Sequence, residues 1–321
     1  MKRLLKSWVG YLDQLYLRQI PEKPHVLGLM LHKLFEDKNT AQGEFTMPHE
    51  RLTVRELEAL IVFFLEKGYT FITPSALSEG RFSSEKNYVI LTFDDGYFNN
   101  TLALPVLEKY QVSALFFIAT HYTLREMPYW WDVLYRERRK RNASLEQILE
   151  EVEEYKRQPR EQIEETLRKA FGSESFCWQD LDRPLTTDEL RNFAAHPLVH
   201  IGNHTADHYA LANWEATTVY DQLTRAQEML AEHAGKPPQW VAYPNGSYTA
   251  GTLEIARDVG LEYGLTIEAK KVYFPIRNTM ELGRFSGRIA QATDEVFWES
   301  QRHDRKPPLL TGLQQLRQNL S

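Results

Sequence analysis

The sequence predicts an α/β protein with a largely parallel sheet, and two observations carry this prediction. Short apolar runs of β type alternate with helical patterns along the chain, which is the order that parallel strands and their connecting helices produce. The 321 residues are 42% apolar, enough for one sizeable core, in one barrel-like domain or two small ones. Seven strands with helices between them suit an incomplete or distorted (β/α) barrel, and a doubly wound open sheet fits the same pattern.

The expected elements follow in chain order. Apolar runs predict strands at residues 26–31, 70–72, 88–93, 114–119, 198–201, 240–243 and 263–266. Between them, apolar residues at helical spacing predict helices, the clearest over 54–67 and 215–232. The run at 88–93 is the strongest strand signal in the chain.

Three segments flank or interrupt this alternation. Residues 1–22 predict an amphipathic helix with Leu5, Trp8, Leu12 and Leu15 on one face, which either packs on the domain or lies on an anionic membrane surface. The barrel is expected over residues 23–300, with a densely charged helical insertion at about 136–172 that contains a helix start at Ser144. This insertion is expected on the barrel rim, and a partner-binding arm is the alternative. Residues 301–321 predict a C-terminal helical tail.

Charge and composition exclude several classes of protein. Lys and Arg total 38 against 44 Asp and Glu, a net charge of −6, so the basic footprint of a general nucleic-acid binder is missing. No apolar stretch approaches the roughly 20 residues that span a bilayer, and polar residues interrupt the N-terminal pattern where a signal peptide would continue. We therefore expect a cytoplasmic location, with peripheral contact to the inner face of the cytoplasmic membrane as an option. The single cysteine, Cys177, excludes an intramolecular disulfide and is expected to be a packing residue.

Two polar clusters follow predicted strands. Asp94 and Asp95 end the strand at 88–93, and two adjacent carboxylates usually have a cation, a shared proton or solvent nearby because they repel when both are ionised. His204 and His208 follow the strand at 198–201, and histidines four apart meet on one face where the backbone is helical. With a carboxylate from another strand end they form a candidate two-His, one-carboxylate site, which leaves positions open for water and substrate.

Two further strand ends fit the same site. The strand at 26–31 ends in His32, and the strand at 240–243 runs from Tyr243 into the tight turn Pro244-Asn245-Gly246. Backbone N–H groups of such a turn can face a developing oxyanion. In a parallel barrel the carboxyl ends of the strands converge on the face that holds the active site. Four strand ends are therefore expected to deliver these polar groups to one place.

Three of these segments resemble the main motifs of the polysaccharide deacetylase family. They read LTFDDGY at 91–97, GNHTADH at 202–208 and AYPNG at 242–246, and further matching stretches lie at 104–107, 114–117 and 130–132. The likeness runs from about residue 26 to residue 288 and keeps the order of the motifs. It implies a distorted (β/α) barrel of about seven strands that binds a divalent metal, usually zinc. It also implies hydrolysis of acetyl groups from chitin-like, peptidoglycan or exopolysaccharide sugars.

Carried over by position, the resemblance implies a division of roles among the polar residues. Asp94 would be the general base and Asp95 the carboxylate ligand of the metal. His204 and His208 would be the imidazole ligands, and the backbone N–H of Asn245 would join the oxyanion site. The resemblance implies Zn²⁺ as the metal, with Co²⁺ or Ni²⁺ able to substitute.

The sequence departs from the family pattern in two places. Many members carry an Arg shortly before the Pro of the third motif, and residues 239–242 contain none. Arg284 or Arg288 either orients Asp94 in its place or has a surface or structural role. A late Leu-x-His motif, which supplies the general acid in many members, is also missing. His32 resembles the early-strand histidine of some exopolysaccharide deacetylases and is the expected general acid, with strand capping as the alternative.

The remaining site residues are expected to contact the substrate. They are Tyr243, Pro244, Arg284 and Trp131, the last of which belongs either to a sugar-stacking platform or to the core. His121 is a further candidate for the wall of the cleft. We expect a metal-dependent hydrolase that removes an acetyl group from an N-acetylated sugar of a polysaccharide or its precursor. The alternatives are a catalytically silent carbohydrate-binding module on the same barrel and a two-His, one-carboxylate iron oxygenase, which would leave the second aspartate unexplained.

Overall fold

The computed structural model describes residues 16–17, 21–41, 46–177, 180, 182–286 and 295–304. Most of the expected N-terminal amphipathic helix and the tail after residue 304 lie outside these ranges. Among the helices within them, none combines the length and the apolar character that a membrane span needs.

A mostly parallel sheet forms the centre of the fold, in the order β10-β1-β5-β6-β7-β8-β9, with β11 beside β1 and β4 beside β5. The strands are β1 His25–Leu31, β4 Thr70–Phe71, β5 Tyr88–Phe93, β6 Ala114–Ile118, β7 Val199–Asn203, β8 Trp240–Ala242, β9 Tyr263–Leu265, β10 Val272–Tyr273 and β11 Arg284–Ser286. A separate parallel pair joins β2 Leu34–Phe35 to β3 Leu52–Thr53. All seven expected strands are confirmed, with ends that differ by no more than two residues.

The sheet curls until its two ends meet, which settles the choice between a barrel and an open sheet. β11 pairs with β1 in parallel, and Leu282, two residues before β11, bridges to Leu265 in β9. The approach of β11 to β1 requires a glycine at position 28, because a Cβ there would lie 2.7 Å from the carbonyl oxygen of Gly283. The expected distorted (β/α) barrel is therefore confirmed.

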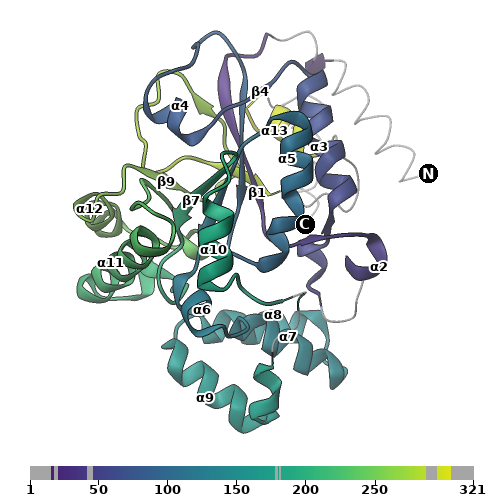
Figure 1. Ribbon diagram of the computed structural model, residues 1–321, viewed down its shortest axis with the longest axis vertical. Helices are drawn as coiled ribbons and strands as arrows, with labels where there is room; N and C mark the ends of the chain where they lie inside the picture. Colours follow the sequence, from purple (N-terminus) through teal and green to yellow (C-terminus); the bar gives the residue numbers. More distant parts are fainter. Residues whose placement is uncertain are drawn as a thin grey trace, which may run out of the picture.

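Helices cover the outside of the sheet. They are α2 Lys38–Ala41, α3 Val54–Glu66, α4 Pro74–Ser78, α5 Leu104–Tyr110, α6 Thr120–Arg125, α10 Thr187–Ala194, α11 Ala216–His233, α12 Ala250–Asp258 and α13 Glu295–Asp304. In Figure 1, α3, α5 and α13 lie on one side of the sheet and α11 and α12 on the other. The expected helices at 54–67 and 215–232 are α3 and α11, and Thr53 and Glu56 close a capping box at the start of α3.

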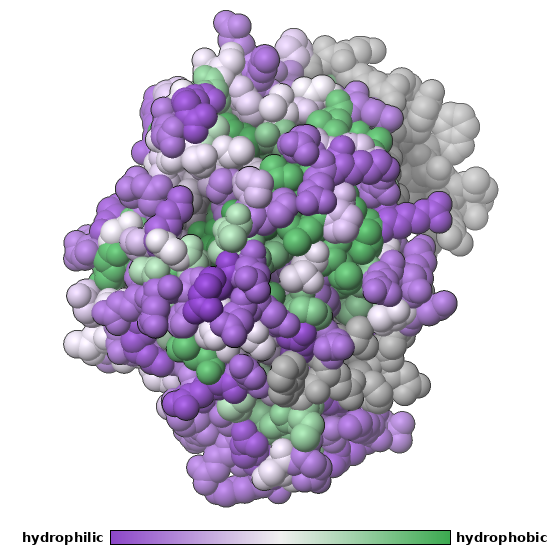
Figure 2. All heavy atoms as spheres, viewed as in Figure 1, coloured by the Kyte–Doolittle hydropathy of each residue, from purple (hydrophilic) through white to green (hydrophobic). Residues whose placement is uncertain are grey.

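The expected insertion at about 136–172 contains two whole helices and the end of a third. The two whole helices are α8 Leu145–Tyr155 and α9 Arg160–Phe171, and they lie together with α7 Trp130–Lys140 at one end of the molecule (Figure 1). Their inner faces share an apolar cluster that includes Val133, Ile148 and Leu167. Ser144 caps α8 as expected, in a capping box with Gln147. The outward surface of this end is mostly hydrophilic (Figure 2), which explains the dense charge of the segment.

Candidate metal centre and active site

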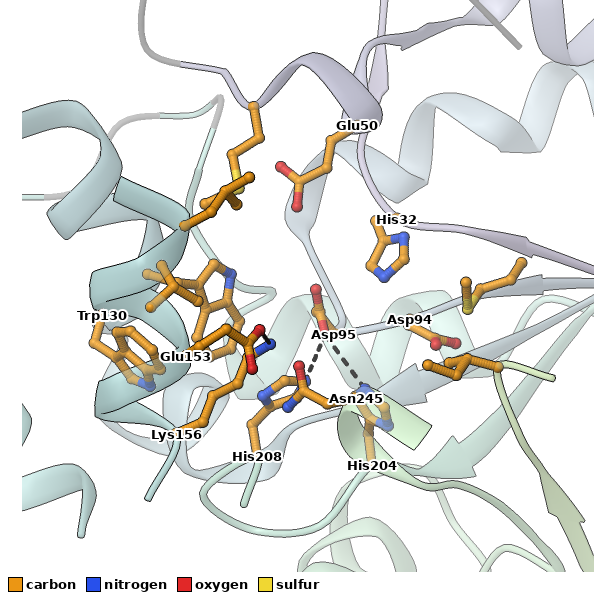
Figure 3. Close-up of a pocket in the computed structure, with 16 residues that line it drawn as sticks. His32, Glu50, Asp94, Asp95, Trp130, Glu153, Lys156, His204, His208 and Asn245 are labelled. Carbon is orange, nitrogen blue, oxygen red and sulfur yellow. Dashed lines mark hydrogen bonds and ion pairs between the residues drawn. The ribbon is translucent and has the colours of Figure 1, made fainter. Parts of the chain in front are cut away.

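A pocket of about 180 Å³ opens at the carboxyl ends of the central strands (Figure 3). The polar residues expected at four strand ends all line it: His32 after β1, Asp94 and Asp95 after β5, His204 and His208 after β7, and Asn245 after β8. Parallel strands end on the same face of a barrel, and this shared direction brings together residues that are more than 200 positions apart in the chain.

The two histidines reach the pocket from a loop, and the expected helical pairing is wrong. Residues 204–208 contain no helical turn, and Thr205 and His208 have left-handed φ angles of 64° and 56°. The loop is held against the segment after β6, where the N–H of Thr120 donates to the carbonyl of Thr205 over 3.2 Å. The two imidazole rings lie 4.8 Å apart between centroids, so the loop achieves the convergence expected from a helix.

Asp95, His204 and His208 form a compact set of ligand atoms, all within 4.8 Å of one another. Oδ1 of Asp95 lies 3.3 Å from Nε2 of each histidine. Ligand atoms bound 2.0–2.2 Å from a tetrahedral zinc ion lie roughly 3.3–3.5 Å from one another, so both distances are suited to a shared ion. Three protein ligands also leave one position of a tetrahedral site open.

The hydrogen bonding of His204 determines which of its ring nitrogens faces Asp95. Its Nδ1 lies 2.8 Å from the carbonyl oxygen of Ala242, which only accepts, so Nδ1 carries a proton and Nε2 faces Asp95. Burial alone would lower the pKa of His204, but Asp95 and Asp94 raise it above its ordinary value. The two carboxylates therefore favour a positive charge beside them. A divalent cation bound by Asp95, His204 and His208 would supply that charge, and the set fits the metal that the resemblance implied.

Asp94 faces the pocket beside this set and is held by Arg284. Two short hydrogen bonds join the groups, from Nη1 to Oδ1 over 2.6 Å and from Nη2 to Oδ2 over 2.8 Å. Arg284 is completely buried and also donates to Thr92 Oγ1 and the carbonyl of Thr266. Burial would raise the pKa of Asp94, but Arg284 and then His204 hold it below its ordinary value. Asp94 is therefore an ionised carboxylate, the form that accepts a proton.

The comparisons with known proteins agree with this geometry. Residues 82–264, more than half of the chain, match the sequence model of the polysaccharide deacetylase family. The chain belongs to this family. No curated protein matches it in sequence.

Several solved structures share the fold, among them the following three. The Streptococcus pyogenes deacetylase PplD, solved in complex with acetate, is 16% identical, with a TM-score of 0.56 over 87% of this chain and 98% of its own. IcaB from Ammonifex degensii is 20% identical, with a TM-score of 0.56 over 82% of this chain and 91% of its own. The BpsB deacetylase domain from Bordetella bronchiseptica is 18% identical, with a TM-score of 0.54 over 83% and 98%. These likenesses support the barrel architecture.

Four residues were expected to contact the substrate of this deacetylase. All four lie in the described part of the chain, and of them only Trp131 lines the pocket. Its ring centroid lies 4.5 Å from that of His208, and its Nε1–H donates to Tyr97 Oη over 2.9 Å. Tyr243 is completely buried in an apolar cluster, Pro244 is buried, and Arg284 lies behind Asp94. These three residues support the pocket from behind because the turn after β8 and the short β11 direct their side chains into the core.

His121 also lies away from the pocket, behind the loop with the two histidines. Its Nδ1 is 3.4 Å from Oδ1 of Asp207. Burial and the nearby charge of Arg160 lower the pKa of His121 to about 4. Arg288, the alternative partner for Asp94, falls outside the described residues.

A buried polar network beside the pocket was not expected from the sequence. Lys33 contacts both Asp132 and Glu50, and Tyr97 Oη donates to Asp132 Oδ2 over 2.8 Å. Burial raises the pKa of Asp132 to about 7 despite the opposing charge of Lys33. Because Tyr97 also accepts from Trp131, the network supports the ring that packs against His208. Each residue is unremarkable by itself in the sequence, and only the contacts of α7 with the segments that follow β1 and β5 join them.

The insertion contributes one wall of the pocket. Leu149, Val152 and Glu153 from α8 line it, together with Lys156 just after this helix and Trp130 from α7. Figure 3 shows Lys156 and Glu153 near His208. Nζ of Lys156 lies 2.5 Å from Oε1 of Glu153. The sequence placed this segment on the rim of the barrel, but its charged character concealed the few residues that face inward.

Proposed function

We propose that the protein is a metal-dependent hydrolase that removes the acetyl group from an N-acetylated sugar of a polysaccharide or its precursor. Membership in the polysaccharide deacetylase family supports deacetylation of an acetylated polysaccharide. The observation that carries the finer proposal is the placement of an Asp-His-His ligand set next to an ionised aspartate in one pocket.

Asp95, His204 and His208 would hold the metal. Two imidazoles and one carboxylate suit zinc, with Co²⁺ or Ni²⁺ as substitutes. When bound, the metal polarises the acetyl carbonyl and acidifies water. The hydrogen bond from Nδ1 of His204 to Ala242 orients one ligand, and the ring of Trp131 packs against the other.

Asp94 acts as the general base and takes a proton from the attacking water. Arg284 fixes the orientation of its carboxylate by the two-pronged contact and keeps it ionised, which a base must be before it accepts a proton. Asn245 lines the pocket, and its backbone has a left-handed φ of 57°. Its backbone N–H donates to the oxyanion that forms on the former carbonyl oxygen.

His32 donates the proton that the leaving amine needs, because an amide nitrogen cannot depart as an anion. It lines the pocket opposite the turn that contains Asn245 and lies close enough to Asp94 to affect its pKa.

The size of the pocket limits what enters it. Pockets that enclose drug-sized ligands measure roughly 300–1,000 Å³, and this one measures about 180 Å³. We infer that the acetamido end of one sugar occupies it and that the rest of the substrate lies across the mouth. Leu149 of the insertion and Ile267 after β9, both partly exposed, border that mouth.

The test is an acetate-release screen with the full chain and added zinc. The substrates are N-acetylated monosaccharides, nucleotide sugars and oligosaccharides. Acetate release that stops with a chelator and returns with zinc supports the proposal. Sugar binding without acetate release from any substrate would favour the silent binding module, and oxygen-dependent turnover would favour the oxygenase.

A further inference from the structure

A second buried cluster of charges lies behind the metal site, centred on Asp207. This residue stands between His204 and His208 in the sequence and is 3% exposed. Its carboxylate accepts from Arg160 Nε over 2.7 Å, from Gln222 Nε2 over 2.6 Å and from Arg225 Nη1 over 3.2 Å. Its backbone N–H donates to Gln222 Oε1 over 2.8 Å. Asp207 therefore anchors the loop on the side away from the pocket.

Arg160, the first residue of α9, connects this loop to the insertion. It is 7% exposed, and its Nη1 donates to Glu164 over 2.8 Å while Nε donates to Asp207. Its backbone N–H donates to Tyr209 Oη over 3.1 Å. The start of α9 thus holds both neighbours of His208, one through a side-chain ion pair and one through a hydrogen bond.

The backbone of His208 needs such support. A left-handed φ is uncommon for a residue other than glycine and persists where the surroundings impose it. Gln222 and Arg225 come from α11, on the barrel, whereas Arg160 is the insertion's contribution to Asp207. Arg225 is half-exposed, so Arg160 supplies the better-buried of the two guanidinium groups.

We propose that Arg160 is a positioning residue for the metal site, and that the insertion sets the affinity of the site by holding Asp207 and thereby His208. This inference rests on the proposed metal site. Without the guanidinium, Asp207 keeps Gln222 and a half-exposed Arg225, while Glu164 loses its partner in the cluster. The carboxylate of Asp207 then rotates or binds water, and the imidazole of His208, the next residue, is no longer held in one position.

The test compares zinc affinity in Arg160→Gln and Arg138→Gln, measured on the full-length apo-protein by competition with a chromophoric chelator. Arg138 is the matched control because it makes two 2.7 Å hydrogen bonds to Glu151 within the same insertion instead of to the loop. Residues that orient metal ligands typically change affinity 10–100-fold. We expect the dissociation constant for zinc to rise about tenfold or more in Arg160→Gln and less than twofold in Arg138→Gln.

Two further variants keep the inference open to refutation if Arg160→Gln does not fold. Arg160→Lys retains the charge but lacks the planar guanidinium whose separate N–H groups reach Asp207 and Glu164, so we expect an intermediate loss of affinity. In Asp207→Asn zinc binding should weaken, and adding Arg160→Lys should then have little further effect, because both act through one contact; a full additional loss in the double variant would overturn the inference.

The outcomes distinguish failure of the positioning role of Arg160 from failure of the proposed metal site. An unchanged dissociation constant in Arg160→Gln, or an equal rise in Arg138→Gln, would overturn the positioning role while leaving the proposed function intact. A wild-type protein that binds no zinc, cobalt or nickel would overturn the metal site and with it the role of Arg160.

Discussion

Replacing Asp94 by Asn tests the division of labour between the two adjacent aspartates. The substitution keeps the shape of the side chain and removes its ability to take a proton. A positioned base contributes roughly 10²–10⁴ in rate, equivalent to about 2.7–5.4 kcal/mol of transition-state stabilisation. We expect kcat for acetate release to fall by that factor while the zinc content, carried by Asp95, His204 and His208, stays at the wild-type level.

The same substitution affects stability through Arg284. Asn offers one acceptor oxygen where the carboxylate offered two, and the guanidinium remains charged and completely buried. Breaking a buried ion pair costs about 3–5 kcal/mol. We expect about 2–3 kcal/mol here because Arg284 retains its bonds to Thr92 and to the carbonyl of Thr266. Chemical unfolding measures this loss, and kinetics are therefore recorded well below the unfolding midpoint.

Thr92→Val provides the matched control, since it removes another acceptor of Arg284 without altering the carboxylate. It should cost about 1 kcal/mol of stability and less than tenfold in kcat. Wild-type turnover in Asp94→Asn would refute the assignment of the base. Loss of zinc from Asp94→Asn, measured by metal analysis, would show that the two aspartates share the ligand role.

Four other outcomes are expected. The double substitution His204→Ala, His208→Ala should abolish zinc binding and turnover together, and full metal occupancy by elemental analysis would disprove this site. His32→Gln should lower kcat roughly 10²–10⁴ on an amide substrate and much less on an activated acetyl ester, because only the amine must be protonated as it leaves; equal losses would exclude a proton-donating role. His121 stays neutral in the folded protein until about pH 4, whereas the unfolded chain binds its proton near pH 6.5, so acidification from pH 7 to 5 should cost about 1 kcal/mol of stability, after a discount for partial exposure. Urea unfolding of His121→Gln should show a correspondingly weaker pH dependence, and an unchanged one would contradict this reading. Deleting residues 1–20 should release the protein from anionic vesicles without loss of turnover if that segment binds lipid, and insoluble protein would indicate that it packs on the barrel.

The accuracy of the sequence predictions varied with the range of the interactions concerned. The seven predicted strands were recognisable because each lies in a run of mostly apolar residues, most of which enter the core. β11 was missed because it begins with a charged residue and contains a single apolar one, Phe285. Its strand character comes from pairing with β1, and the charge of Arg284 is tolerated in the core because Asp94, 190 positions away, neutralises it.

Local chemistry misled the predictions at two other positions. Spacing suggested a helical turn for His204 and His208, whereas the loop uses left-handed residues held by α11 and the insertion. Cys177 was expected to pack in the core and is exposed, since its neighbour Phe176 takes the buried place at the end of a short 3₁₀ helix. In both cases the deciding contacts come from the three-dimensional surroundings, which residue type and spacing do not describe.

The sequence by itself determined the alternation of parallel strands and helices, and the strand ends that carry Asp94, Asp95, His204, His208 and His32, whereas the pairing of β11 with β1 decided that the sheet closes into a barrel. Strand direction alone sends such residues to one face, so no knowledge of side-chain packing was needed. Only the tertiary structure decided which groups support them: Arg284 behind Asp94, Ala242 behind His204, and the insertion behind His208. Hydrogen bonds and buried ion pairs act over about 3 Å, and the residues that make them here are brought within that distance by the fold, across tens to hundreds of positions of sequence.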